Sequence, residues 1–556
     1  MQARGWDVVD VVLVTGDAYV DHPSFGVALI SRWLEAHGYR VAILSQPPYQ
    51  TSEAFREFGR PRLFFGITAG NLDSVVANYS GNARVRDEDS FSSDGNPYRG
   101  EGKQKALRRR PDRATILYAN LARAAYPEVP IVLGGLEASL RRFIHYDFKQ
   151  AKLRGSILTD AKADLLVFGM GERAVLEIAA RLKNKGNLTD IPGTCERLKE
   201  LEKGKRIFPL PPELLPSWHE IEADLSLFLK AEIAVERLCR AGSPIPILQQ
   251  QQGMWVLQHR PADPLSVSEL DRLYSLPFTR LPHPNAGDVP AYRMIRHSIT
   301  IVRGCPGNCS FCAISRHQGG RIISRSQASV IEEVKQVRIM PDFGGTISDL
   351  GGPTANLYGV SCSKPSCRRY DCLYPVVCRH LRVDEDMFLD LLLKVIAIPG
   401  IKNVFISSGL RMELLLRTPG LLKQIVSSHV PGMLKIAPEH TEEHVLRLMH
   451  KGNALLLPEF LKACRNILGI KGRPLLFSPY IMTSHPGCTL NDMKLLKTKI
   501  KRLGLSVRKF QDFTPTPGTI STAMYVTGLD RDTEKPIPVV RKVSERRAQR
   551  LILEGM

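Results

Sequence analysis

The stretch GCPGNCSFC, residues 304–312, contains three cysteines and directly follows the apolar run SITIV (298–302). The cysteines, Cys305, Cys309 and Cys312, have the spacing C-x3-C-x2-C. A structural zinc ion takes four protein ligands, and a disulfide bond takes two cysteines. Three thiolates would leave one position of a metal centre open, and an open position is where metal chemistry takes place.

The residues around these cysteines suit an iron–sulfur cluster. Gly304 and Gly307 allow the tight, partly left-handed backbone that wraps a compact cluster. A 4Fe–4S cluster held by three thiolates has one iron without a protein ligand, and the amino and carboxylate groups of S-adenosylmethionine can chelate that iron. An electron from the cluster can then cleave the sulfonium and release a carbon radical. The alternatives are incidental thiols or a zinc site with His317 as the nearest fourth ligand. The position of the triad directly after a strand favours the cluster.

Apolar runs and helical segments alternate on both sides of this stretch, which predicts an α/β protein. Residues 293–530 show six strands, each leading into a helix or loop, at 298–304, 345–352, 403–409, 433–440, 474–483 and 505–515. Six units are too few for a closed eight-unit barrel, so we expect a partial (β/α)6 barrel with its site at the carboxyl ends of the strands. Cys305 begins such an end.

The first half predicts a doubly wound parallel sheet over residues 1–195, with Gly-rich turns after the strands at 129–139 and 163–172. In such sheets these turns lie at the edge where ligands bind. Residues 196–292 are expected to form a helical and Pro-rich linker region. Residues 531–556 are expected to form a basic C-terminal tail.

A second group of four cysteines lies in a predicted insertion at 360–382. Cys362, Cys367, Cys372 and Cys378 have the spacing x4, x4 and x5, and His380 follows. Four soft ligands within seventeen residues favour a zinc ion or an auxiliary iron–sulfur cluster. Free thiols in the insertion are the alternative. The remaining cysteines, Cys195, Cys239, Cys464 and Cys488, have no such spacing and are expected to be structural.

Composition limits the class of protein. The 556 residues lack an apolar run of about 18, which a membrane span needs, and the N-terminus lacks the zones of a signal peptide. The sequence therefore predicts a cytoplasmic protein with no membrane contact. Its net charge is +20. A solvated basic surface explains that charge, and nucleic acid stays open as a partner. Walker A, H-E-x-x-H and G-x-S-x-G motifs are absent, so hydrolase and NTPase activities lack their usual residues.

The sequence resembles the radical SAM superfamily, for which C-x3-C-x2-C with an aromatic residue before the last cysteine, here Phe311, is the hallmark. Nearly the whole chain resembles the YgiQ-like radical SAM family, whose N-terminal domain is similar to cobalamin-binding domains. The matching stretches are TGDAYVDHPSFG (15–26), RPDRATILYANLAR (110–123), VLGGLEASLRRFIHYD (132–147), HSITIVRGCPGNCSFCAI (297–314), SDLGGPTANLYG (348–359), KIAPEHT (435–441) and TPTPGTISTAMY (514–525).

The resemblance implies that Cys305, Cys309 and Cys312 ligate the cluster and that the main chain at Phe311 contacts the adenine of S-adenosylmethionine. The turn DLGGPT resembles the one that receives the cofactor's amino group. Pro353 replaces an acidic residue of the common form, so only backbone contacts from Gly351 and Gly352 carry over. The other residues expected near the cofactor are Ser407, Ser408, Glu439 and His440, and ordinary loop capping is the alternative for these four.

The resemblance also implies a function: reductive cleavage of S-adenosylmethionine to a 5′-deoxyadenosyl radical, followed by hydrogen abstraction from an unknown substrate. A reducing partner such as flavodoxin or ferredoxin is then expected. Cobalamin is unlikely on this view, because the chain lacks D-x-H-x-x-G and Asp21-His22 has the wrong spacing. The alternatives are an RNA-modifying, methylthiotransferase-like radical SAM enzyme, favoured by TPTPGT and the charge, and a non-catalytic iron–sulfur protein. No catalytic residue is predicted.

Overall fold

The computed structural model describes residues 1, 4–100, 107–199, 208, 210–240, 242–364, 367, 369, 371–468 and 475–554. It divides the chain into two compact units. Unit 1 comprises Met1–Pro264, Leu276–Arg296 and Thr516–Gly518, and unit 2 comprises Leu265–Ser275, His297–Pro515 and Thr519–Met556. The sequence KQKALRRRPDR (103–113), in which basic residues are concentrated, lies partly outside the described residues.

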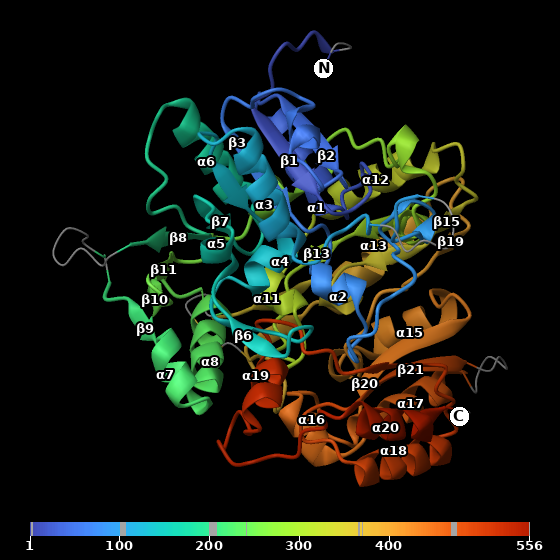
Figure 1. The fold of residues 1–556 in the computed structure, drawn as a ribbon. Helices are drawn as coiled ribbons and strands as arrows, with labels where there is room; N and C mark the ends of the chain where they lie inside the picture. Colours follow the sequence, from blue (N-terminus) through green and yellow to red (C-terminus); the bar gives the residue numbers. More distant parts are fainter. Residues whose placement is uncertain are drawn as a thin grey trace. The chain divides into compact units, whose positions relative to one another are not determined.

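Unit 1 contains a nine-stranded sheet with the order β2-β1-β3-β4-β7-β8-β11-β10-β9 (Figure 1). Its first five strands are parallel: β2 (Val41–Ser45), β1 (Val11–Thr15), β3 (Phe64–Thr68), β4 (Ile131–Leu133) and β7 (Leu165–Val167). This order is the flavodoxin-like arrangement of a doubly wound sheet. It confirms the predicted α/β class.

Alternate residues of the central strands face opposite sides of this sheet, because successive side chains of a strand point to opposite faces. Val12 and Val14 pack into a core with helices α3 (Ala114–Ala125) and α5 (Ile157–Asp160). Val11 and Leu13 pack into a second core with α1 (Gly26–Glu35) and α6 (Glu172–Lys183). Both faces are therefore covered. Shorter elements follow the strands: α2 (Ser74–Asn78), α4 (Gly135–Leu140), β5 (His145–Asp147) and β6 (Lys152–Arg154).

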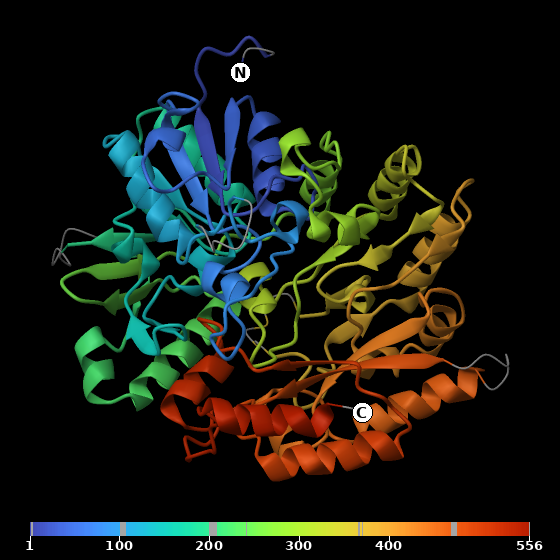
Figure 2. The same ribbon diagram turned by 45° about the vertical axis from the view of Figure 1, so that its right-hand side comes forward.

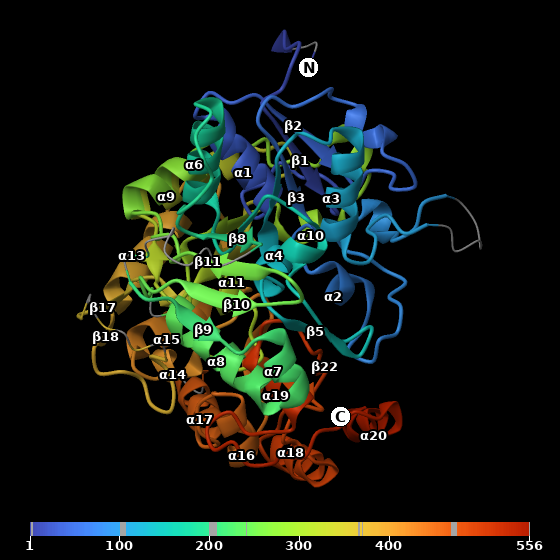
Figure 3. The same ribbon diagram turned by 60° about the vertical axis from the view of Figure 1, so that its left-hand side comes forward.

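The predicted linker region continues this sheet. Strand β8 (Thr194–Leu198) pairs antiparallel with β7, β11 (Trp255–Gln258) with β8, and β10 (Ile247–Gln250) with β11, whereas β9 (Glu213–Leu215) runs parallel to β10. Figure 3 shows these strands leading to helices α7 (Trp218–Ala223) and α8 (Ser226–Arg240). The segment 276–296, with α10 (Pro290–Ile295), also belongs to unit 1.

Unit 2 repeats strand and helix along the chain. Parallel pairs join β12 (Ser298–Thr300) to β16 (Asp349–Gly351) and β15 (Thr346–Ile347) to β19 (Asn403–Val404). A parallel three-stranded sheet follows: β20 (Met433–Glu439), β21 (Leu476–Thr483) and β22 (Lys509–Asp512). The six predicted strand positions all contain one of these strands. The fold class, a partial barrel after a doubly wound sheet, is confirmed.

Helices flank the unit 2 strands, with α17, α18 and α20 drawn in orange and red in Figure 2. Their buried side chains include Val334, Leu392, Ile425, Phe460 and Leu496, and the strands contribute buried residues such as Leu350 and Ile481. The helices are α9 (Val267–Tyr274), α11 (Ile314–Gln318), α12 (Gln327–Arg338), α13 (Glu385–Ile396), α14 (Met412–Leu415), α15 (Pro419–Ser428), α16 (Glu443–Leu448), α17 (Leu456–Leu468), α18 (Leu490–Arg502), α19 (Ile520–Thr527) and α20 (Val543–Leu553).

The predicted basic tail, residues 531–556, differs from the structure, which places α20 in it. Arg546, Gln549 and Leu553 of this helix are buried, and α20 lies against α18, β21 and β22. The sequence pattern VSERRAQRLIL is dominated by its charged residues, so the narrow buried face was not apparent.

Candidate active site

The three cysteines of the first group lie on a loop at the end of the first strand region of unit 2. The loop leaves β13 (Val302–Arg303) at Gly304 and ends at α11. Cys305 and Cys309 are buried, and Cys312 is half-buried. The backbone N–H of Cys312 donates to the Cys309 carbonyl at 3.0 Å, so the second and third cysteines share one turn.

Backbone hydrogen bonds fix this loop at both ends. The Cys305 N–H donates to the Gly319 carbonyl at 3.1 Å. The Ser310 N–H donates to the Met449 carbonyl at 2.9 Å, and the Ser310 hydroxyl donates to the Leu448 carbonyl at 2.7 Å. The loop is therefore held by the end of α16, far away in the sequence.

Arg411 is the cation of this site, and no motif in the sequence indicates it. Its Nη2 lies 3.5 Å from both Cys305 Sγ and Cys309 Sγ, and its Nη1 lies 3.3 Å from Glu413. Burial lowers the pKa of Arg411, but Cys309 and Cys305 raise it more, so the pKa lies well above its ordinary value. A buried guanidinium beside two sulfurs stabilises thiolates, which are the form that binds metal.

The site fits a 4Fe–4S cluster in three respects. It supplies three cysteine sulfurs on one loop, the number that leaves one iron of the cluster without a protein ligand. In the part of the chain that the structure describes, the three sulfurs do not all lie within 4.8 Å of one another, which is the spacing that the ligands of a single ion need. Finally, Asn308 Oδ1 and Nδ2 are buried in the loop and lack a partner among described residues, which suits a bound polar group.

The glycine-rich turn at Gly351 and Gly352 lies close to Ser408 and to Val302, which precedes the cysteine loop. An added Cβ on Gly351 would lie 2.1 Å from Ser408 Oγ, and one on Gly352 would lie 2.5 Å from the Val302 carbonyl oxygen. Only glycine fits at these two positions. Phe311 is half-buried, and its ring packs edge to face against the His485 ring, with 6.3 Å between the ring centroids.

Ser407 and Ser408 are organised by Asp349, which lies at the start of β16. Asp349 Oδ1 accepts from both serine N–H groups, at 2.7 and 3.0 Å, and from the Ser408 hydroxyl at 3.2 Å. The Ser407 hydroxyl donates to the Ser348 carbonyl. Burial raises the pKa of Asp349. Both hydroxyls thus make internal hydrogen bonds of the kind that the loop-capping alternative describes.

Glu439 ends β20 in a strained conformation. Its φ is +64°, and the register of β20 against β21 shifts between Ile436 and Glu439. Its Oε2 is buried without a hydrogen-bond partner among the described residues. Burial raises the pKa of Glu439, against Lys451 and Arg411, which lower it. Strain and an orphaned carboxylate oxygen together are typical of functional sites.

His440, the next residue, is engaged elsewhere. It is buried, its Nδ1 accepts from the Glu442 N–H at 3.1 Å, and its Nε2 lies 3.5 Å from Cys488 Sγ. Burial lowers its pKa to about 3, so the imidazole is neutral. His440 therefore caps the loop after β20.

The carboxyl edge of the unit 1 sheet is lined with buried ion pairs. Arg110 pairs with Asp17 at 2.5 Å and with Asp89 at 3.1 Å, and Arg141 pairs with Asp73 at 2.6 Å. Asp21 pairs with Arg32 at 2.5 Å, and His22 Nδ1 accepts from the Ser24 N–H. No local sequence pattern indicates these pairs, because their partners lie up to 93 residues apart.

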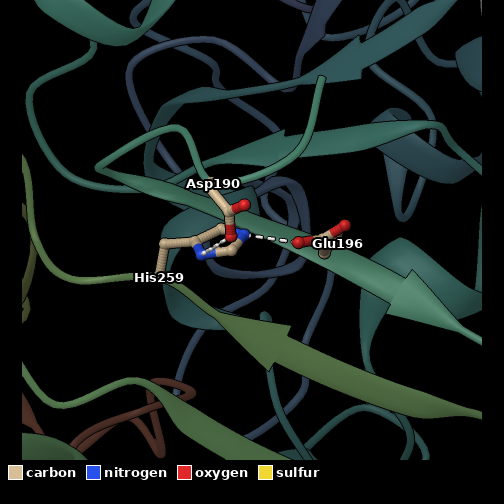
Figure 4. Close-up of side chains that lie close together, drawn as sticks. All are labelled: Asp190, Glu196 and His259. Carbon is tan, nitrogen blue, oxygen red and sulfur yellow. Dashed lines mark hydrogen bonds and ion pairs between the residues drawn. The ribbon is translucent and has the colours of Figure 1, made fainter. Parts of the chain in front are cut away.

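Another cluster in unit 1 brings together Asp190, Glu196 and His259 (Figure 4). Their ligand atoms lie within 4.8 Å of one another. His259 Nε2 lies 2.5 Å from Glu196, and its Nδ1 lies 3.7 Å from Asp190. The imidazole thus faces a carboxylate on each side.

Two family models match the chain. The model described as Radical SAM N-terminal matches residues 1–298, and the model described as Radical SAM superfamily matches residues 299–498. The fold, the cysteine triad and these matches define a radical SAM enzyme. The superfamily uses a 4Fe–4S cluster and S-adenosylmethionine, as predicted.

The relatives define the family. A UPF0313 protein of Geobacter sulfurreducens is 45% identical, and the match covers 99% of this chain and 90% of that protein. A UPF0313 protein of Methanocella arvoryzae is 42% identical over 100% of this chain and 91% of its own length. The chain belongs to the UPF0313 family, that is, the YgiQ family, and the predicted family is confirmed.

A solved structure shares the fold. The radical S-adenosylmethionine methyltransferase TsrM from Kitasatospora setae, with cobalamin and a [4Fe–4S] cluster bound, matches with a TM-score of 0.52 and 16% identity, covering 91% of this chain and 76% of TsrM.

Across the described residues, no helix combines the length and apolarity that crossing a membrane needs.

Proposed function

We propose that Cys305, Cys309 and Cys312 hold a 4Fe–4S cluster and that this chain cleaves S-adenosylmethionine reductively to a 5′-deoxyadenosyl radical, which abstracts hydrogen from a substrate. The observation that carries this proposal is the buried triad with Arg411 against two of its sulfurs. When bound, the cluster supplies the electron and an iron that S-adenosylmethionine chelates.

The surrounding residues have separate tasks in this proposal. The backbone at Gly351 and Gly352 contacts the amino group of S-adenosylmethionine, and the main chain at Phe311 contacts its adenine. Glu439, with its orphaned oxygen, accepts a hydrogen bond from the cofactor. Ser407 and Ser408 shape the loop through Asp349.

Anaerobic reconstitution tests the proposal. Protein loaded with iron and sulfide, reduced with dithionite and given S-adenosylmethionine, is expected to form 5′-deoxyadenosine. Cys309→Ala should form none, whereas Cys464→Ala, which removes a buried thiol of α17, should retain activity. Equal product from wild type and Cys309→Ala would contradict the proposal.

Cobalamin belongs among the candidate cofactors of unit 1, because TsrM, which has this fold, binds it. The expectation that cobalamin is unlikely has no support from the comparisons. A corrinoid at the carboxyl edge of the sheet would meet the buried pairs of Arg110 and Arg141. The corrinoid absorption of protein purified from cobalamin-fed cells tests this. A reducing partner such as flavodoxin or ferredoxin, and RNA as substrate, stay predictions.

A further inference from the structure

Four cysteines of unit 2 lie outside the triad. Cys362 is exposed, Cys367 and Cys372 are half-buried, and Cys378 is buried. The function proposed above uses none of them. Their arrangement depends on a short antiparallel hairpin, β17 (Val360–Cys362) and β18 (Leu381–Val383).

The hairpin joins the first cysteine to the last two. Cys362 pairs with Leu381 across the hairpin. The Leu381 N–H donates to the Cys378 carbonyl at 3.0 Å, and the Cys378 N–H donates to the Cys372 carbonyl at 2.8 Å. A chain of hydrogen-bonded neighbours thus links Cys362, Cys378 and Cys372.

The remaining cysteine joins the same group through Lys364. The Lys364 carbonyl oxygen accepts a hydrogen bond from the Cys367 N–H at 3.0 Å. The same oxygen lies 3.6 Å from Cys362 Sγ. The Arg369 N–H donates to Cys367 Sγ at 3.4 Å, a bond that stabilises a thiolate.

The spacing of the sulfurs favours a cluster over a single ion. Zinc binds four sulfurs at about 2.3 Å, which brings them to roughly 3.8 Å from one another. Of the described residues, no three of these cysteines have Sγ atoms within 4.8 Å of one another, which is also true of the triad. In a 4Fe–4S cluster each thiolate binds a different iron, so the sulfurs lie farther apart.

The charge of the segment also suits a cluster. Four thiolates around a 4Fe–4S core carry excess negative charge. Residues 360–382 contain only one acidic residue, Asp371, and five basic ones: Lys364, Arg368, Arg369, Arg379 and Arg382. Cations near a metal–thiolate centre stabilise the deprotonated ligands.

We propose that Cys362, Cys367, Cys372 and Cys378 bind a second 4Fe–4S cluster, with a protein thiolate on every iron and hence no iron for S-adenosylmethionine. Assembly of the oxidised 2+ cluster takes two ferrous ions, two ferric ions and four sulfides and releases the four thiol protons. The site adjoins the triad loop: the Cys372 N–H donates to the Pro306 carbonyl at 3.1 Å, and an added Cβ on Gly307 would lie 3.2 Å from Leu373. This inference does not depend on cleavage of S-adenosylmethionine.

The test counts iron and sulfide in the full-length chain, reconstituted anaerobically with ferric iron, a thiol reductant and sulfide. We expect about eight irons per chain in the wild type, about four in Cys305→Ala/Cys309→Ala/Cys312→Ala, and about four in Cys372→Ala/Cys378→Ala. Cys464→Ala, the matched control, should keep about eight. In the triad variant, the electron paramagnetic resonance signal of the reduced cluster should not change when S-adenosylmethionine is added.

Three results would overturn the inference: a triad variant without iron, a wild type with about four irons and one zinc, or a signal in the triad variant that S-adenosylmethionine alters. If the variants fold poorly, the wild-type protein alone decides, because Mössbauer spectra should show two 4Fe–4S clusters, one of which responds to S-adenosylmethionine. Failure of the proposed function is distinguishable, because it appears as missing 5′-deoxyadenosine at an unchanged iron count.

Discussion

Arg411 places a buried positive charge against two sulfurs of the triad. A cation stabilises the reduced, more negative cluster, so its removal should make reduction harder. We predict that Arg411→Gln lowers the midpoint potential of the triad cluster by on the order of 100 mV, from a Coulomb energy of roughly 3 kcal/mol at an effective dielectric constant of about 20. Spectroelectrochemical titration of the reconstituted protein measures this shift.

Arg411→Lys is the matched control, because it keeps the charge and loses the forked geometry. Its potential should lie closer to that of the wild type than the potential of Arg411→Gln does. Equal shifts in both variants would mean that geometry rather than charge sets the potential.

Gly304 and Gly319 can be compared directly, because their φ angles are nearly equal, at +81° and +80°. An added Cβ on Gly304 would lie 1.8 Å from the Arg321 carbonyl oxygen, whereas one on Gly319 meets nothing within 4 Å. We predict that Gly319→Ala costs roughly 1–3 kcal/mol from strain alone and that Gly304→Ala costs at least about 2 kcal/mol more. Urea unfolding measures both, and equal losses would show that the loop moves to admit the methyl group.

Single residues show what the sequence could predict about the site. The triad was apparent because its spacing is local, and Glu439 because it ends an apolar run. Arg411 was not, because its contacts with Cys309 and Cys305 span 102 and 106 residues. Asp349 was missed for the same reason: it binds Ser407 and Ser408 across 58 and 59 residues.

At the scale of elements, helix α20 closes the end of unit 2 with few buried side chains. Gln549 Oε1 accepts from the Ser484 N–H at 2.8 Å, and its Nε2 donates to the Cys488 carbonyl at 2.9 Å. We predict that Gln549→Ala lowers the free energy of unfolding by about 2 kcal/mol, because two buried backbone groups lose their partners. Arg547→Ala, on the exposed face of α20, should change it by less than about 0.5 kcal/mol. Chemical denaturation compares the two, and similar losses would contradict a buried role for Gln549.

His450 ties the cysteine-rich insertion to the end of α16. Its Nδ1 lies 2.9 Å from Asp371, its Nε2 lies 3.3 Å from Asp532, and Tyr374 stacks on its ring. Burial and Arg531 lower the pKa of His450, but the bonds to Asp371 and Asp532 raise it more, so the net shift is upward from 6.5. A raised pKa stabilises the folded form fully below the unfolded pKa, and this stabilisation is lost as pH rises through the folded pKa.

We therefore predict that amide exchange in residues 371–381, corrected for the intrinsic rate, becomes several-fold faster as pH rises from about 6 to about 8. His450→Gln should remove this dependence. Mass spectrometry of exchanged peptides measures it, and a wild-type protection factor that stays constant over this range would contradict the role of His450.

The elements themselves were predictable where the pattern is long and apolar. The parallel strands of unit 1 and all six strand positions of unit 2 follow from apolar runs. Strands β8 to β11 were not predicted as sheet, because 196–292 contains many prolines and its strands pair mainly antiparallel, as in β10 with β11. Those pairings are tertiary contacts, which local composition does not encode.

At the scale of the whole molecule, the chain divides into two compact units and passes between them several times. All seven cysteines with proposed metal-binding roles belong to unit 2. A ligand that binds the folded form stabilises the region that it binds. Loading with iron should therefore stabilise unit 2 and change the stability of unit 1 little.

We predict that loading with iron and sulfide slows amide exchange in unit 2 peptides that contain the cysteine loops, residues 304–320 and 371–381, by tenfold or more, roughly 1.4 kcal/mol or above. Peptides of β1 and β4 in unit 1 should change little. The triad and quartet alanine variants separate the two sites: each should lose the protection of its own loop and keep that of the other. If β1 and β4 gain as much protection as the cysteine loops, the metal centres stabilise the whole chain as one cooperative body, and the division into two independently stabilised units is wrong.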